Sequence, residues 1–152
     1  MEQELMKALT LAGGYAAVSL AAVGSALGTG TAGSSAIGAW KRCYAQNKPA
    51  PFLLMALAGA PLSQTIYGMI LLIFIKNQVA SNAAYWPLFL TMGIVGGVAM
   101  GVSAWYQGKA GAGGCDAFGE TGKGFANYLM ILGIVETVAI FALVFALMAM
   151  PS

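Results

Sequence analysis

Glu136 is the residue whose position most clearly demands a chemical explanation. It lies inside the apolar run ILGIVETVAIFALVFALM, residues 131–148, and is the only charged residue in residues 124–152. A carboxylate at the centre of a bilayer costs at least about 2.5 to 3.5 kcal/mol, and a low dielectric disfavours its charged form. We therefore expect Glu136 to hold a proton or a small cation. The alternative is a protonated carboxyl that only hydrogen-bonds between helices.

Gln107 is the expected neighbour of Glu136. The turn FGETGKG separates two apolar segments, and Thr121 and Gly122 within it lie midway between the two residues. In an antiparallel hairpin, residues equidistant from the turn share a depth. The side chains of Gln107 and Glu136 should therefore meet.

The motif PLSQTIYG carries a second group of oxygen atoms. Ala60, Gln64 and Tyr67 follow the spacing i, i+4, i+7, so they share one helix face, and Ser63 borders that face. Pro61 cannot donate a backbone hydrogen bond and disturbs the preceding turn. Carbonyl groups just before it are thereby freed, which would let the Ala60 oxygen turn toward a ligand.

These residues together offer oxygen ligands of the kind that hard cations require, without sulfur or imidazole. A single negative charge matches a monovalent ion, whereas Ca²⁺ and Mg²⁺ normally draw carboxylates and water. A proton would need only the carboxylate and one acceptor, so the surplus of oxygens favours Na⁺ over H⁺. The predicted Na⁺ ligands are Glu136, Gln64, Gln107, Ser63 and the backbone carbonyl of Ala60, with the Tyr67 phenol beside them.

Helices that cross a membrane must position these ligands. The chain is 59% hydrophobic and 8% charged, against about 25% charged residues in soluble domains. Each of four nearly uncharged stretches exceeds the roughly 20 residues that span a hydrocarbon core. We expect an all-α membrane protein of four transmembrane helices in two tandem hairpins, residues 1–76 and 77–152. The stretches are residues 8–40, 49–75, 77–108 and 124–152.

Lysine and arginine positions predict the orientation. The first and third connections are the more basic, and only Lys7 and Lys76 flank the helices on the other side. We place these two connections in the cytoplasm and both termini opposite. The net charge of +2 is a topology signal rather than a sign of a nucleic-acid partner. The basic residues of the two connections are Lys41, Arg42, Lys48, Lys109 and Lys123.

The two halves also resemble each other. SALGTGTAGSSAIGAW, residues 25–40, aligns with SAWYQGKAGAGGCDAF, residues 103–118, and PLSQTIYG then falls on GIVETVAI. Gln64 is the counterpart of Glu136, so one hairpin carries a carboxylate and the other its amide analogue. In the first hairpin, Gln64 and Thr29 are equidistant from Gln46 and Asn47, so these two side chains are predicted to meet in the same way.

Small residues spaced four apart occur in both the first and the third predicted helix. One row is Gly93, Gly97 and Gly101, and the other is Gly24, Gly28 and Ala32. Such rows let helix backbones approach closely in membranes. They would serve either packing within one four-helix bundle or a crowded inner ring of many copies.

These motifs resemble the ring proteolipid, or K (c) subunit, of V-type rotary ATPases, particularly the bacterial sodium-translocating kind. The resemblance spans essentially the whole chain, through PLSQTIYG, YQGKAGAGG and IVETVAI. It implies a sodium site with Glu136 as the carboxylate, the two glutamines, Ser63 in place of threonine, the Ala60 carbonyl, and Tyr67 bonded to the glutamate. The effect of Thr65 beside Gln64 is left open.

The resemblance further implies a non-catalytic rotor subunit. Copies of the chain would form a ring, with Glu136 facing lipid or a stator subunit that supplies an essential arginine. The chain has no phosphate-binding loop, so ATP chemistry belongs to partner subunits, and no organic cofactor is expected. Central-stalk subunits would dock on the cytoplasmic turns, at Lys41, Arg42, Asp116 and Glu120. Lys109, inside the third span, would snorkel or face the ring interior.

Three other functions share some of these features. The nearest is the same rotor carrying H⁺. A small cation-coupled antiporter also uses one membrane glutamate but does not need two glutamines and a hydroxyl at one depth. A membrane glutathione-utilising transferase requires several cationic contacts, and Arg42 is the sole arginine. The absence of histidine and of a CxxC motif argues against a zinc or redox site, and Cys43 and Cys115, near the predicted cytoplasmic ends, are expected to be inert reduced thiols.

Overall fold

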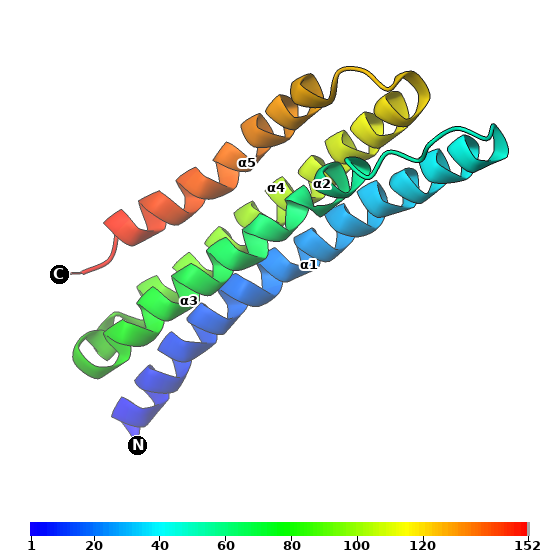
Figure 1. Ribbon diagram of the computed structural model, residues 1–152. Helices are drawn as coiled ribbons and strands as arrows, with labels where there is room; N and C mark the ends of the chain where they lie inside the picture. Colours follow the sequence, from blue (N-terminus) through cyan, green and yellow to red (C-terminus); the bar gives the residue numbers. More distant parts are fainter. Residues whose placement is uncertain (152) are drawn as a thin grey trace.

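The computed structural model describes residues 1–151, and every regular element within them is helical. The long first helix α1 (Glu2–Ala45) is followed by α2 (Leu54–Gly59), a 3₁₀ turn η1 (Ala60–Leu62) and α3 (Ser63–Asn82). A second 3₁₀ turn η2 (Ala83–Tyr85) leads into α4 (Trp86–Thr121), and α5 (Phe125–Met148) ends the chain. Successive segments run up and down one elongated bundle (Figure 1).

Three helical stretches are long and apolar enough to cross a membrane: Glu2–Ala45, Leu54–Thr121 and Phe125–Met148. The middle stretch contains the second and third helices expected from the sequence, because η2 keeps the chain helical where it reverses direction (Figure 1). The predicted boundary after residue 76 falls within α3, which continues to Asn82. A lone lysine at position 76 does not end a helix, because lysine is itself a good helix former.

Two glycines form the turn between α4 and α5. The sequence placed this turn at Thr121 and Gly122, and α4 does end at Thr121. Gly122 (φ 65°) and Gly124 (φ 84°) adopt left-handed backbone conformations, which glycine enters without the steric cost of a Cβ atom. The expectation that the third helix includes Gln107 and Lys109 is also confirmed.

The glycine rows hold α1 against α4 within one chain. A Cβ atom on Gly24 would overlap the backbone of Gly101, and one on Gly93 would overlap Gly13. Side chains are absent where the two backbones meet, so dispersion contacts between the helices replace the missing interdigitation. Within one chain these rows therefore pack α1 against α4, and their use in a crowded inner ring of many copies stays a prediction.

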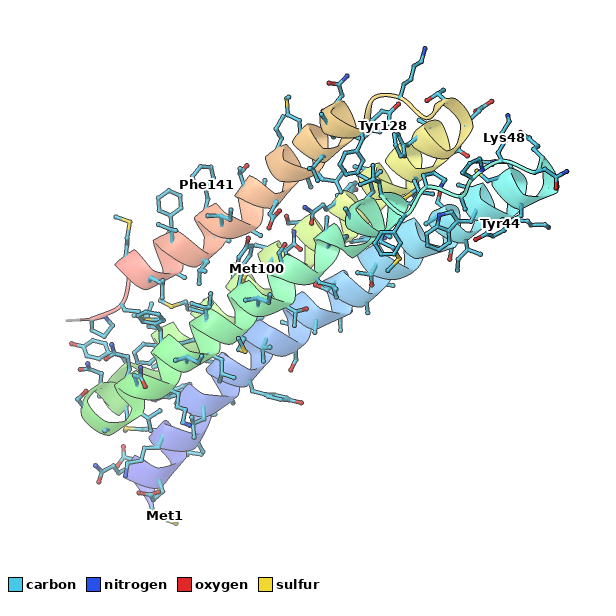
Figure 2. All side chains as sticks on the ribbon, viewed as in Figure 1. Met1, Tyr44, Lys48, Met100, Tyr128 and Phe141 are labelled. Carbon is cyan, nitrogen blue, oxygen red and sulfur yellow. The ribbon has the colours of Figure 1, made fainter. Side chains whose placement is uncertain are left out.

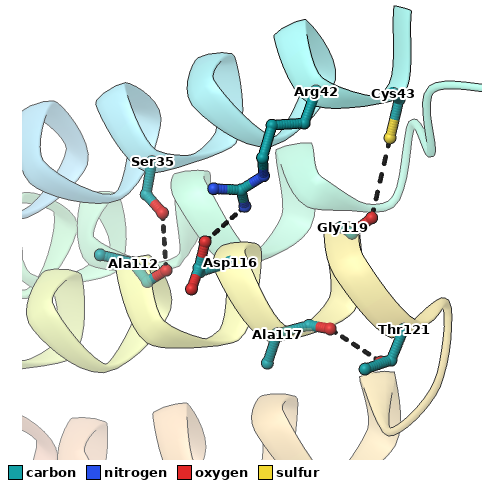
Figure 3. A network of polar contacts seen from close by, with 8 residues as sticks. All are labelled: Ser35, Arg42, Cys43, Ala112, Asp116, Ala117, Gly119 and Thr121. Atoms are coloured by element: carbon teal, nitrogen blue, oxygen red, sulfur yellow. Dashed lines mark hydrogen bonds and ion pairs between the residues drawn. The ribbon is translucent and has the colours of Figure 1, made fainter. Parts of the chain in front are cut away.

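Polar contacts join α1 and α4 at the end of the bundle that carries the α1–α2 and α4–α5 connections (Figure 3). The Ser35 hydroxyl donates to the Ala112 carbonyl at 2.7 Å, and Arg42 pairs with Asp116. The thiol of Cys43 lies 3.7 Å from the Gly119 carbonyl. Both cysteines are free and buried.

The outer surface of α5 is strongly apolar. Its exposed side chains include Ile134, Val138 and Phe145, and Phe141 points away from the bundle (Figure 2). Contiguous apolar surface of this kind indicates contact with a membrane or a partner. The inward side of the helix includes the buried residues Leu132 and Ala139, and Glu136 lies between them along this side.

Lys109 is exposed on α4, and two aromatic rings lie close to its ammonium group. The nitrogen lies 4.2 Å from the Trp105 ring centroid and 4.8 Å from that of Tyr106. Cation–π attraction of this kind is worth about 0.5 kcal/mol or more. The aromatic faces thus replace part of the solvation that the lysine would lose inside a span.

Candidate functional site

Glu136 belongs to the row of α5 residues that faces the bundle, between the buried Leu132 and Ala139. Its side chain is half-buried, and both carboxylate oxygens accept hydrogen bonds. The donors of these bonds lie on α3 and α4 of the same chain. The orientation of Glu136 toward the outside of a ring, which the resemblance implied, stays a prediction.

Tyr67 and Gln107 are those donors. The Tyr67 hydroxyl lies 2.6 Å from Glu136 Oε1, and Gln107 Nε2 lies 3.2 Å from Oε2. Hydrogen bonds to an ionised group are about twice as strong as neutral ones. The predicted contact between Gln107 and Glu136 is present, and Tyr67 donates to the other carboxylate oxygen.

The two glutamine amides connect the carboxylate to the motif around Pro61. Both side chains are fully buried. Gln64 Nε2 donates to Gln107 Oε1 at 2.8 Å, and Gln107 Nε2 also donates to the Leu132 carbonyl at 3.0 Å. Both hydrogens of the Gln107 amino group are thus used, which fixes the orientation of this amide.

Ser63 lies at the other end of the network, between two acceptors. Its Oγ is 3.1 Å from the Ala60 carbonyl oxygen and 3.2 Å from Gln64 Oε1. A serine hydroxyl has only one hydrogen to donate. Three oxygens therefore share a single hydroxyl hydrogen at this point, although the Ala60 oxygen also accepts the Ser63 backbone N–H, and a cation would be a further partner for their lone pairs.

The 3₁₀ turn at Pro61 determines where the Ala60 carbonyl lies. In this turn the Ser63 backbone N–H donates to the Ala60 oxygen. The carbonyl that loses its helical partner to Pro61 is that of Leu57, four residues earlier, and it faces Gly111 on α4. The sequence correctly predicted a disturbed backbone, but the tighter turn, not a lost N–H, directs the Ala60 oxygen.

All six predicted residues therefore join one hydrogen-bond network contributed by η1, α3, α4 and α5. Thr29 does not join it, because its hydroxyl donates to the Ser25 carbonyl of its own helix at 2.8 Å. Within residues 1–151, no three His, Cys, Asp or Glu side chains gather as metal ligands. Glu136 is instead surrounded by neutral donors and oxygens. The six are Ala60, Ser63, Gln64, Tyr67, Gln107 and Glu136.

Ser103 is a site residue that the sequence reasoning did not assign. Its hydroxyl donates to the Val135 carbonyl at 2.9 Å and so braces α5 directly beside Glu136. The available signal was its position four residues before Gln107, on the same helix face. It also opens the repeat segment that aligns with residues 25–40.

Residues 90–149 match the family model of the C subunit of ATP synthase. The matched region is less than half of the chain and contains most of α4 and all of α5, including Gln107 and Glu136. A comparison with curated proteins finds no match. The second hairpin is thus similar to the ATP synthase C subunit.

Proposed function

We propose that this chain is a membrane rotor-ring subunit of a V-type ATPase or ATP synthase, which carries Na⁺ across the membrane at Glu136. The match of residues 90–149 to the ATP synthase C subunit supports the rotor assignment. The observation that carries the ion assignment is the oxygen cluster at Ser63, where three oxygens share one hydroxyl hydrogen. The subunit itself is non-catalytic, and partner subunits supply the ATP chemistry.

The donors around Glu136 favour a cation over a proton as the cargo. Tyr67 and Gln107 both donate to the carboxylate, which is the pattern an anionic carboxylate needs. A protonated carboxyl would instead donate its hydrogen, which requires the Tyr67 hydroxyl to turn and act as the acceptor. Na⁺ would draw on the carboxylate, the Ser63 hydroxyl, the Ala60 carbonyl and the glutamine oxygens, all of them hard ligands.

Rotation follows from the charge of the loaded and empty site. With its cation bound the site is neutral overall and can face lipid, whereas the empty carboxylate is an anion that lipid does not tolerate. An arginine of a stator subunit would stabilise the empty site as it passes. Each ion that crosses about 100 mV supplies about 2.3 kcal/mol, so several ions are needed for each ATP.

The basic connections after α1 and α4 would lie in the cytoplasm, where central-stalk subunits dock. Lys41, Arg42, Asp116 and Glu120 lie at that end of the bundle and are exposed. Cysteine substitution of Lys48 and labelling with a membrane-impermeant reagent from each side would test this orientation. Labelling of intact cells from outside would contradict it.

Carbodiimide labelling of Glu136 tests the cargo. The protein in mild detergent is treated at fixed pH with increasing Na⁺ or with K⁺ at the same ionic strength, and the modified carboxyl is identified by mass spectrometry. We expect Na⁺ to protect Glu136 and K⁺ not to do so. The variant E136Q should lose the labelled site, whereas E120Q, at an exposed carboxyl, should behave as the unmodified chain. Labelling that follows pH but ignores Na⁺ would instead support H⁺ as the cargo.

A further inference from the structure

Ser25 on α1 carries the one buried side-chain oxygen or nitrogen within residues 1–151 that has no hydrogen-bond partner. The residue is 2% exposed. A buried polar atom without a partner costs about 1 to 3 kcal/mol, so its retention calls for an explanation. Ser25 does not belong to the network around Glu136 described above.

The register between α1 and α3 places Ser25 opposite Gln64. A Cβ atom on Gly68 would lie 3.0 Å from the Ala21 Cβ, and one on Gly28 would lie 2.9 Å from the Pro61 Cβ. These two contacts define an antiparallel register. Ser25 is four residues after Ala21, and Gln64 is four residues before Gly68, so the two share a level on facing surfaces.

The amide of Gln64 has one N–H hydrogen without a partner. Its amide nitrogen carries two hydrogens, and one of them is used in the bond to Gln107 Oε1. The side chain is fully buried, so water does not reach the second hydrogen. A spare N–H donor and an unpartnered hydroxyl oxygen therefore lie at one level, between the same helices.

The internal repeat shows how a serine at this position is used in the other hairpin. Ser103, which aligns with Ser25, donates to the backbone of α5 beside Glu136. The corresponding backbone beside Gln64 follows the 3₁₀ turn at Pro61, and the Ser25 hydroxyl makes no such bond. The first hairpin thus keeps the serine but frees its hydroxyl for another partner.

We propose that Ser25 is a positioning residue of the ion site. When Gln64 Oε1 turns toward the cation, the Ser25 hydroxyl accepts the spare hydrogen of the Gln64 amide and holds the oxygen in the ligating orientation. Ser25 acts only through Gln64 and does not touch the cation. This inference rests on the proposed cation-carrying function and adds to it a residue on α1, a helix that contributes no ligand.

The test measures Na⁺ protection of Glu136 from carbodiimide in the full chain, kept in mild detergent in its native oligomeric state. Loss of one neutral hydrogen bond in the loaded state should raise the Na⁺ concentration for half-protection roughly three- to tenfold in S25A. S25T, which keeps the hydroxyl, should stay within about twofold of the unmodified chain. S25C has nearly the size of serine but is a poor acceptor, and it should follow S25A.

Matched controls separate positioning from a structural role. S35A removes a serine hydroxyl from the same helix, one that bonds Ala112 instead, and should leave the Na⁺ dependence unchanged. In K⁺ buffer, S25A should melt no lower than the unmodified chain, because no bond is lost there and an unpartnered buried hydroxyl is removed. The rise in melting temperature caused by Na⁺ should shrink in S25A.

Different outcomes overturn the proposed function and the role of Ser25. If Na⁺ does not protect the unmodified chain, the proposed function fails. If Na⁺ protects the unmodified chain, and S25A and S25C are half-protected at the same Na⁺ concentration as the unmodified chain, the proposed function stands and the role of Ser25 is wrong. A melting temperature of S25A that is lower by the same amount in K⁺ and Na⁺ would also contradict a positioning role.

Discussion

Glu136 illustrates how neighbouring groups give one side chain its chemistry. Its oxygens accept bonds from Tyr67 and Gln107, and Gln107 is held in turn by Gln64 and by the Leu132 carbonyl. Because an amide nitrogen only donates and an amide oxygen only accepts, the network has a defined direction that ends at the carboxylate. Its other end, at Ser63, is rich in acceptors. The site therefore combines a satisfied anion with a cluster of oxygens that attracts a cation.

Tyr67 should contribute measurably to retention of the ion. The substitution Y67F removes the 2.6 Å bond to Glu136 but keeps the ring, and hydrogen bonds to charged groups are worth about 1.5 to 3 kcal/mol. We expect the Na⁺ concentration for half-protection from carbodiimide to rise at least about tenfold.

The control is Y106F, at an exposed tyrosine beside Lys109. It should leave the Na⁺ dependence unaltered. An equal shift in both variants would mean that the loss of a phenol anywhere loosens the bundle, and that the Tyr67 bond has no specific role.

At the scale of the elements, two irregular features make the site possible. The 3₁₀ turn η1 tightens the backbone before α3, and the glycine rows bring α1 and α4 close together. The first directs the Ala60 oxygen. The second forms the rigid two-helix support on which α3 and α5 lie, so that groups from η1, α3, α4 and α5 meet.

Glycines on α1 should differ sharply in their tolerance of a methyl group. In G24A the new Cβ would overlap the Gly101 backbone, and since a helix backbone cannot move locally, α1 and α4 must separate. Overpacking of this kind costs about 1 to 3 kcal/mol. We expect a lower midpoint of thermal unfolding in detergent, followed by circular dichroism.

G30A is the matched substitution on the same helix. A Cβ at Gly30 would meet nothing within 4 Å, and alanine is the better helix former by up to about 1 kcal/mol. The unfolding midpoint should be unchanged or higher. If both variants unfold at the same temperature as the unmodified chain, close backbone packing does not stabilise this bundle.

At the scale of the whole molecule, α5 leaves much of its apolar surface uncovered by the rest of the bundle. Ile134, Val138 and Phe145 are exposed on it. One face of the molecule is therefore left for lipid or for further copies. The proposed ring would use part of this surface for contacts between chains.

The proposed ring predicts a multimer. In mild detergent, the mass of the protein without its detergent, from light scattering or native mass spectrometry, should be a large multiple of the 15.5 kDa chain. Substitution of an outward α5 residue, as in F141A, should change the contacts with lipid or with neighbouring copies but not the ligand network. A single 15.5 kDa species under conditions that keep Na⁺ protection would contradict the ring.

Residue types and spacing determined much of this protein in advance. Charge-free stretches predicted the helices, and the equal distance of Gln107 and Glu136 from the turn predicted their contact. The i, i+4, i+7 spacing likewise placed Ala60, Gln64 and Tyr67 on one face. These inferences succeed because helix periodicity and hairpin geometry depend on local sequence distance alone.

Only the tertiary structure decided how the helices share their partners. It directed Gln64 to Gln107 rather than to Thr29, brought donors from α3 and α4 to Glu136, and packed the glycine rows of α1 and α4 together. It also gave Ser103 a carbonyl partner and left its counterpart Ser25 without one. Such choices depend on which helices become neighbours and on a tight turn at Pro61, and neither is encoded in the spacing of residues along one helix.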